Sequence, residues 1–306
     1  MHAGQPEISD LVVAYDPETL ARLPVRRDEV LAELERHGMQ RAVKIVSRWP
    51  HDGGVLDAHF VDRVLLSAHH ELTRLSEEFM QGRRMRRILA PLLGTLRREG
   101  VPGPYRIVDV GCGLGFVTRW LAAHGELGTD VELWGCDYNA AFVRFAQDLA
   151  NEERLACRFV VGNAFRLETP AAIFVSTGVV HHFRGSALEQ FMAEQSRAGA
   201  AAFVHADIKP SYLAALGSWI FHEARMREPL ARHDGVLSAL RAHSGELLVR
   251  SAQSACPGYV AAMFDGAREL LPILKVMQML VGLRQELVPA FREELGPLLC
   301  HMPGLA

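Results

Sequence analysis

Three glycines follow an aspartate at the end of a run of β-forming residues, in the stretch YRIVDVGCGLGF (105–116). Asp109 precedes Gly111, Gly113 and Gly115, which are spaced two residues apart. Glycines at this spacing allow a tight strand-to-helix turn and let the backbone approach a ligand closely. The stretch therefore predicts a ligand-binding loop at the end of a strand.

Polar side chains also follow three later runs of β-forming residues. The second run ends in Asp137, 26 residues after Gly111, and the fourth is soon followed by His181 and His182. The groups that follow the third and fourth runs are Gly162, Asn163 and Ala164, then Ser176, Thr177 and Gly178. A parallel sheet binds its ligand beyond the carboxyl ends of its strands, so we expect these groups to lie around one site.

The glycine loop differs from the dinucleotide-binding fingerprint. The last glycine of GxGxxG is replaced by Phe116, and an aspartate before the loop disfavours a pyrophosphate. A ligand with an ammonium or sulfonium group and a ribose, but no phosphate, suits the loop better. Asp137 can accept hydrogen bonds from both ribose hydroxyls, and Asn163 can pair with an adenine edge. Alternatively, the glycines form only a tight turn and Asp137 only caps a helix.

The pattern of elements changes at EGVPGPY (99–105). Residues 1–100 predict mostly helices, whereas the following hundred residues alternate short apolar β-rich runs with helical stretches. This alternation is typical of a doubly wound parallel sheet. The predicted strands are 105–110, 131–137, 157–163, 171–177, 201–207, 245–254 and 258–265. The remaining predicted elements are a helical insertion at 209–244 and two closing helices at 266–281 and 283–300, with 269–283 as a buried helix.

Residues 105–208 resemble class I S-adenosylmethionine (SAM)-dependent methyltransferases. VDVGCGLG, LWGCDYN, VVGNAF and FVSTGVVHHF match four motifs of this family, in order and at the family's spacing. The resemblance implies an α/β, Rossmann-like, mostly parallel seven-stranded sheet whose last strand is antiparallel. The helical additions at both ends would form a lid. We expect a helical lid and substrate region at 1–103, a SAM-binding core at 104–268, and C-terminal helices at 269–306.

The resemblance also implies roles for individual residues. The glycines would let the backbone approach the methionine part of SAM, and Asp137 would hold the ribose. Tyr138 would lie against adenine, and Asn163 would face the adenine amino group, where the family commonly has aspartate. Arg83 is a weaker candidate for the cofactor carboxylate. The expected cofactor-binding set is Asp109, Gly111, Cys112, Gly113, Gly115, Asp137, Tyr138, Asn163, Ala164, Phe165, Ser176, Thr177, Gly178 and Arg83.

The histidine pair His181–His182 is the predicted catalytic element. An acceptor hydroxyl must lose a proton during methyl transfer, and a histidine titrating near neutral pH is a natural base. A structural or helix-capping role for the pair stays open. His205 and Asp207 are second candidates, for which we favour hydrogen bonding within a loop.

The sequence therefore predicts a methyltransferase that acts on a small-molecule acceptor, by O-methylation in secondary metabolism, with S-adenosylhomocysteine (SAH) as product. N- or C-methylation stays open. The alternatives are an RNA or protein methyltransferase, or a SAM-binding protein of this fold with other chemistry. Candidate pocket residues in the insertion, for which an ordinary solvated helix is an equal interpretation, are Trp219, Phe221, His222, Arg225, Arg227 and His233.

Composition narrows the class of protein. The 306 residues are 49% hydrophobic and 23% charged with a formal net charge of −3, which gives no general attraction to nucleic acid or anionic membrane. The arginines at 83–98 are interpreted as a solvated helix flank. The five cysteines form no CxxC pair and the 14 histidines no HExxH motif, so we expect no metal site. With no secretory leader or membrane span recognised, we expect a cytoplasmic protein. Assembly into a homodimer stays open.

Overall fold

The computed structural model describes residues 4–210, 217, 223–265 and 276–305. Within these ranges the chain forms two compact units. Unit 1 comprises residues 1–75 and 210–242, and unit 2 comprises 76–209 and 243–306. These boundaries differ from the expected domains, because the long helix at 81–98 belongs to unit 2 with the sheet.

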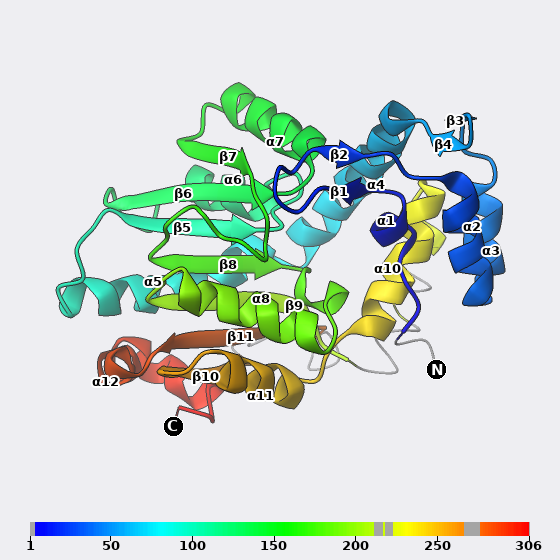
Figure 1. Cartoon of the computed structure of the whole chain (residues 1–306). Helices are drawn as coiled ribbons and strands as arrows, with labels where there is room; N and C mark the ends of the chain where they lie inside the picture. Colours follow the sequence, from blue (N-terminus) through cyan, green and yellow to red (C-terminus); the bar gives the residue numbers. More distant parts are fainter. Residues whose placement is uncertain (1–3, 211–216, 218–222, 266–275, 306) are drawn as a thin grey trace. The chain divides into compact units, whose positions relative to one another are not determined.

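Unit 2 is built on a seven-stranded sheet with the order β10-β11-β9-β8-β5-β6-β7. The strands are β5 (Tyr105–Val110), β6 (Val131–Asp137), β7 (Cys157–Val161), β8 (Ile173–Thr177), β9 (Ala202–Ile208), β10 (Tyr259–Phe264) and β11 (Met277–Arg284). β5 to β9 are parallel, whereas β11 lies antiparallel between β9 and β10. Figure 1 shows β5, β6, β7 and β8 side by side. The predicted seven-stranded α/β fold is confirmed.

Helices cover both faces of this sheet because successive residues of its strands point to opposite sides. Ile107 packs with α5 (Gln81–Arg98), α6 (Phe116–His124) and α12 (Val288–Leu295). Its neighbour Val108 packs with α8 (Ser186–Arg197) and α11 (Gly245–Ala255) on the other face. The helix α7 (Ala140–Glu152) packs on β6 and β7. Short 3-10 helices are η1 (Val180–His182), η3 (Gln285–Leu287) and η4 (Gly296–His301).

Unit 1 is mostly helical, as predicted, with two short hairpins that the sequence did not predict. Its helices are α1 (Ile8–Leu11), α2 (Arg27–Arg36), α3 (Gln40–Val46), most of α4 (Ala58–Glu78) and α10 (Pro229–Arg241). The hairpins pair β1 (Ala14–Tyr15) with β2 (Arg22–Leu23), and β3 (His51–Asp52) with β4 (Val55–Leu56). Among the described residues, no helix combines the length and apolar composition that crossing a bilayer requires.

Two predicted elements near the C-terminus are wrong. Residues 245–254, predicted as a strand, lie in α11, which begins where the Ser244 side chain accepts a hydrogen bond from the Leu247 amide at 3.2 Å. Residues 277–281, predicted as part of a helix, lie in β11. β11 pairs on both edges and is buried along nearly its whole length, so it shows the continuous apolar run that a buried helix also shows. The rest of the predicted helix, 266–275, lies outside the described residues.

Candidate active site

The glycine loop follows β5 and is joined to the end of β6 by backbone hydrogen bonds. The amides of Gly111 and Cys112 donate to the carbonyl of Cys136 at 2.8 and 3.0 Å. Gly111 and Gly115 have φ of +69°, in the left-handed region that glycine adopts without strain. A Cβ at Gly115 would lie 2.3 Å from a ring carbon of Phe159. The loop therefore needs glycine at this position both for its backbone conformation and for its packing.

Asp109 lies at the end of β5 and is buried. Thr118, in the first turn of α6, donates to its Oδ2 at 3.1 Å, while Oδ1 is buried without a hydrogen-bond partner among the described residues. Burial raises the pKa of Asp109 from 3.8 to about 7, and the charge of Asp137 adds to the rise. An unsatisfied carboxylate oxygen in this position is suited to a cationic or hydrogen-bond-donating ligand.

Asp137 ends β6 and braces the glycine loop. Its two oxygens accept backbone N–H groups, from Gly113 at 3.0 Å and from Asn139 at 2.9 Å. Burial raises the pKa of Asp137 to about 6, although these two hydrogen bonds and the charge of His182 oppose the rise. Helix capping, the alternative role considered for Asp137, is performed by Asn139, whose side chain accepts from Ala141 at 2.9 Å. Tyr138 between them is exposed.

The loop after β7 contains the predicted adenine-facing residues. The Oδ1 of Asn163 accepts a hydrogen bond from the amide of Phe165 at 2.9 Å, across Ala164. An asparagine has one acceptor oxygen where an aspartate has two. The oxygen expected to accept from an adenine amino group therefore also accepts a backbone amide within the loop.

The end of β8 lies beside the glycine loop because β8 pairs with β5. Ser176 is fully buried and contacts the Nδ1 of His205 at 2.8 Å. The Oγ1 of Thr177 is buried without a hydrogen-bond partner among the described residues. Gly178 has φ of +68°, and its amide donates to the carbonyl of Ala206 at 2.8 Å. Thr177 thus offers a second unsatisfied polar atom near Asp109.

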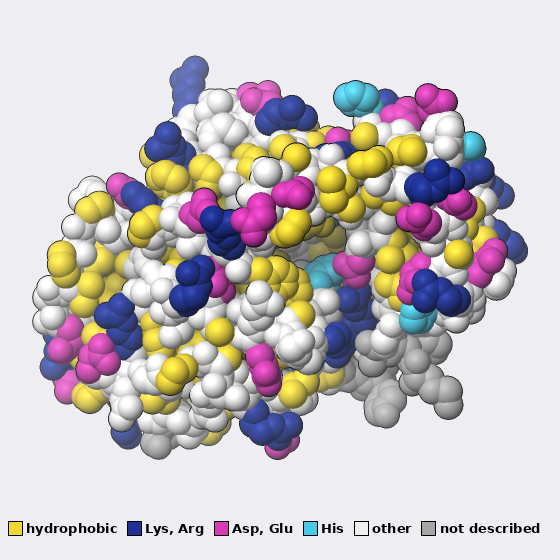
Figure 2. Space-filling view, viewed as in Figure 1, with side chains coloured by type: hydrophobic (Ala, Val, Ile, Leu, Met, Phe, Trp, Pro, Cys, Tyr) yellow, Lys and Arg dark blue, Asp and Glu magenta, His cyan; other side chains and the backbone are white. Residues whose placement is uncertain are grey.

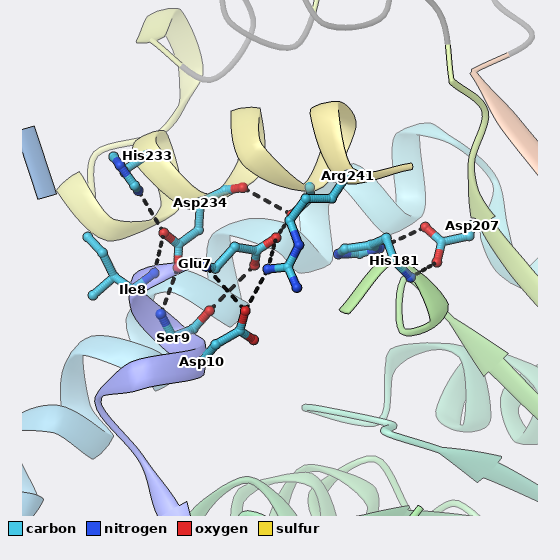
Figure 3. A network of polar contacts seen from close by, with 10 residues as sticks. Glu7, Ile8, Ser9, Asp10, His181, Asp207, His233, Asp234 and Arg241 are labelled. Carbon is cyan, nitrogen blue, oxygen red and sulfur yellow. Dashed lines mark hydrogen bonds and ion pairs between the residues drawn. The ribbon is translucent and has the colours of Figure 1, made fainter. Parts of the chain in front are cut away.

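The histidine pair lies on η1, directly after this strand end. The Nδ1 of His181 lies 2.8 Å from the Oδ1 of Asp207, and the His181 amide donates to the Oδ2 of Asp207 at 3.0 Å (Figure 3). The ring centroids of His181 and His182 are 4.4 Å apart. Burial opposes ionisation of Asp207, but the charge and hydrogen bonds of His181 outweigh it and lower the pKa of the carboxyl.

His205 lies in a buried network, in line with the structural role favoured from the sequence. Its two ring nitrogens contact Ser176 at 2.8 Å and the amide nitrogen of Gln195 at 2.9 Å. Burial lowers the pKa of His205 to about 3, so this ring stays neutral. Asp207, the other second candidate, is not part of this network. Its carboxylate contacts the ring of His181, the catalytic candidate. The sequence did not reveal this pairing, because Asp207 follows His181 by 26 residues and one whole helix.

The arginines at the start of α5 differ in exposure. The side chain of Arg83, the predicted carboxylate ligand, is exposed, whereas Arg84 is half-buried. The Nε of Arg84 donates to the carbonyl of Phe79 at 2.8 Å, and burial lowers the pKa of Arg84. Of the two, Arg84 is the better enclosed in unit 2.

Unit 1 contains a polar network that the sequence analysis missed (Figure 3). Asp234 of α10 accepts from the backbone amides of Ile8 and Ser9 at 3.0 and 2.9 Å, and so satisfies the first amides of α1. Arg241, the last residue of the same helix, forms an ion pair with Asp10 at 2.5 Å. His233, a predicted pocket residue, contacts Asp234 at 2.8 Å. The other pocket candidates in unit 1 include Trp219, Phe221 and His222, which lie outside the described residues.

The family of the sheet unit follows from this geometry together with a sequence match. The methyltransferase domain family Methyltransf_25 matches residues 107–202, from within β5 to the start of β9. The chain contains a class I SAM-dependent methyltransferase domain. No curated protein sequence matches the chain.

Two solved methyltransferase structures are similar to this chain to different degrees. The plantazolicin methyltransferase BpumL, in complex with a desmethylPZN analog and SAH, is 10% identical, with 73% of this chain and 95% of that chain covered and a TM-score of 0.50. The magnesium protoporphyrin IX methyltransferase ChlM from Synechocystis PCC 6803, with bound SAH, is 15% identical. The match covers 85% of this chain and all of that chain, with a TM-score of 0.44.

The residues at the carboxyl edge of the sheet fit SAM. Two buried carboxyl groups, Asp109 and Asp137, have raised pKa values, because burial disfavours their charged forms. The Oδ1 of Asp109 and the Oγ1 of Thr177 are buried polar atoms without partners in the described chain. A ligand carrying an ammonium group and hydroxyl donors would complement these atoms.

Proposed function

We propose that the chain transfers the methyl group of SAM to a hydroxyl oxygen of a small-molecule acceptor, in the biosynthesis of a natural product. The observation that carries the proposal is the convergence of Asp109, Asp137 and the glycine loop at adjacent strand ends, within a domain of the methyltransferase family. Next to them, the ring of His181 contacts the carboxylate of Asp207. This histidine is a group able to take a proton.

The cofactor would be held by groups that retain hydrogen-bonding capacity. Each oxygen of Asp137 accepts one amide and keeps a second lone pair, so the carboxylate can also accept from the two ribose hydroxyls. Asp109 and Thr177 would meet the amino group, and the backbone of Gly111 and Gly113 would line the methionine part. The remaining proposed contacts come from Cys112, Gly115, Ser176, Gly178 and Ala164.

The adenine would lie between Tyr138 and the loop after β7. The Oδ1 of Asn163 accepts the Phe165 amide and keeps a second lone pair. That oxygen would therefore also accept from the exocyclic amino group of adenine. Arg84, or the more exposed Arg83, would face the cofactor carboxylate.

The chain's contribution to the reaction would be alignment and proton removal. When bound, SAM supplies an electrophilic methyl group on a sulfonium centre. The strand ends would fix the position of that group, and holding two reactants in line accounts for a large part of the acceleration of a displacement reaction. One of the two histidines, His181 or His182, would take the proton that the acceptor hydroxyl loses.

Charge supports a small acceptor over a nucleic acid. The formal net charge is −3, and acidic and basic side chains are interspersed across the face shown in Figure 2. Proteins that bind nucleic acids usually display a continuous basic surface. The fold neighbour BpumL is a plantazolicin methyltransferase, which is consistent with a natural-product acceptor here.

The test is transfer of radioactive methyl from labelled SAM to a panel of acceptors. The panel contains phenols, aliphatic alcohols, carboxylic acids, amines, total RNA and a dephosphorylated protein extract. We expect label in a small-molecule hydroxyl product, lost in Asp137→Ala and retained in Asp148→Ala, which changes an exposed aspartate on α7. Label confined to RNA, protein or amines would contradict the proposal.

A further inference from the structure

We infer that Glu194 of α8 is the residue that positions the adenine-binding turn after β7 (residues 163–166), and that this turn, held in one orientation, makes the chain select adenine over hypoxanthine in its cofactor. The inference rests on the proposed function, since it concerns the adenine end of the proposed SAM site. The observation behind it is a set of hydrogen bonds that joins this turn to a nearly buried carboxylate on a neighbouring helix.

The adenine-binding turn is closed by two hydrogen bonds to Asn163. The amide of Arg166 donates to the carbonyl of Asn163 at 3.0 Å, and the amide of Phe165 donates to its Oδ1 at 2.9 Å. Asparagine commonly supports a turn by accepting the backbone amide two residues later. The turn is therefore braced internally, and its position depends on what holds it to the rest of the domain.

The Phe165 amide also fixes which way the carboxamide of Asn163 faces. A backbone N–H can only donate, so the atom that it meets must be the carboxamide oxygen and not the nitrogen. Adenine presents an amino group where hypoxanthine presents a carbonyl oxygen. The oxygen of Asn163 can accept from the amino group but would repel the carbonyl, and turning the carboxamide over would break the bond with Phe165.

Glu194 ties the exit of this turn to α8. Its Oε1 accepts the amide of Leu167, the residue directly after the turn, at 2.6 Å. Only 6% of the Glu194 side chain is exposed, and a buried carboxylate is costly unless its oxygens accept hydrogen bonds. Hydrogen bonds to a charged acceptor are also stronger than those between neutral groups. The bond to Leu167 therefore gives a physical reason for an acid on the buried side of α8.

Arg197 contacts the same carboxylate from the solvent side. Its Nε donates to the Oε2 of Glu194 at 2.7 Å, and its Nη2 contacts Oε1. The Arg197 side chain is 64% exposed, and ion pairs that face water contribute little to stability. The part of Glu194 that holds the turn is therefore its acceptor oxygen, which a glutamine would keep and an alanine would lose.

A second contact holds the turn against the same helix. The ring of Phe165 packs edge-on against Phe183, with ring centroids 4.8 Å apart, and Phe183 packs against Phe191 of α8 at 5.0 Å. Aromatic pairs in such arrangements contribute beyond the area that they bury. Residues 162–172, all in the described part of the chain, contain no helix of their own. The turn is thus supported by α8 at two points, Phe191 and Glu194.

The first experiment is calorimetric titration of the full chain with SAH and with S-inosylhomocysteine, which carries hypoxanthine in place of adenine. We expect the wild type to bind SAH about tenfold or more tightly than the inosyl analogue. In Glu194→Ala this preference should fall to about threefold or less, whereas Glu194→Gln, which keeps the acceptor oxygen, should stay near the wild type. Glu189→Ala, which changes an exposed acid on the same helix, is the matched control.

Each outcome of this titration decides a different point. A preference for SAH that persists in folded Glu194→Ala, or that is lost equally in Glu194→Gln, would overturn the role of Glu194. Equal binding of both ligands by the wild type would overturn the selection by Asn163 and leave the cofactor site in place. Binding of neither ligand would instead refute the proposed function. If Glu194→Ala does not fold, Glu194→Met, which keeps the length of the side chain without a carboxylate, takes its place.

The second experiment needs neither a ligand nor a variant. Hydrogen exchange of the wild type, resolved by residue, should show the Leu167 amide protected about 100-fold or more relative to an unstructured chain, because the Glu194 carboxylate is its acceptor. Exchange of the Leu167 amide at the rate of an unstructured chain would overturn the bond, and with it the positioning role of Glu194.

Discussion

Replacing Asp109 with asparagine should stabilise the cofactor-free protein while weakening its binding of SAM. The carboxyl is buried, and its pKa of about 7 in the folded state compares with 3.8 when unperturbed. Between these values the unfolded chain has released a proton that the folded chain retains, so stability falls as the pH rises. The difference of about three pH units corresponds to about 4 kcal/mol at full ionisation.

The assay is urea denaturation without cofactor at pH 5, 6, 7 and 8, followed by circular dichroism. Between pH 5 and pH 8 the free energy of unfolding of the wild type should fall by about 2–3 kcal/mol relative to Asp109→Asn. Asparagine keeps the acceptor for Thr118 but carries no charge. Saturating SAM should stabilise the wild type more than the variant. If the free energy of unfolding depends on pH in the same way in both proteins, the argument that Asp109 is a buried carboxyl with a raised pKa is refuted.

Three further predictions concern other parts of the chain. Affinity for SAM should decline as the pH falls below about 6, because Asp137 then becomes protonated and accepts fewer hydrogen bonds. Calorimetric titration at pH 5 and pH 8 measures this change, and equal affinities at the two pH values would contradict the prediction. Gly115→Ala should lower the free energy of unfolding by about 2–4 kcal/mol, since its Cβ would overlap Phe159, whereas Gly125→Ala, with a similar φ and open space, should cost about 1 kcal/mol in urea denaturation. Asp234→Ala should destabilise unit 1 by about 1–3 kcal/mol, because the backbone amides of Ile8 and Ser9 lose their acceptor. Hydrogen exchange should show reduced protection of the amides of α1, and unchanged exchange would refute the capping role of Asp234.

The cofactor half of the site could be predicted from the sequence because its signals are local. Asp109 and Asp137 stand at the ends of apolar runs, and parallel pairing brings such ends to one edge of the sheet. The predicted limits of β5 and β6 match the observed ones. Tight strand-to-helix turns leave few alternatives for the glycines between them.

The elements near the C-terminus were harder to predict because their patterns are ambiguous. The run over β11 is apolar without alternation, and burial on both faces gives the same pattern as a buried helix. The signal for α11 was present, since Ser244 precedes a helix with Leu248, Ser251 and Ala252 buried on one face. The adjacent Leu247, Leu248 and Val249 also favour a strand, so the helical spacing is hard to recognise.

The contacts that define the second half of the site depend on tertiary structure. Asp207 reaches His181 only because β9 pairs with β8, and no spacing in the sequence encodes that contact. Asp234 likewise meets the amides of Ile8 and Ser9 across more than 220 residues. Long-range pairs of this kind cannot be read from one sequence, whereas a strand end followed by an acid can.

Calorimetric titration of the full chain with SAM and SAH tests the central claim most directly. We predict saturable binding of both ligands at one site per chain, a loss of affinity of about 100-fold or more in Asp137→Ala, and wild-type affinity in Asp148→Ala. Absence of binding to the folded wild-type chain, or equal affinity in Asp137→Ala, would contradict the assignment of this strand edge as the SAM site.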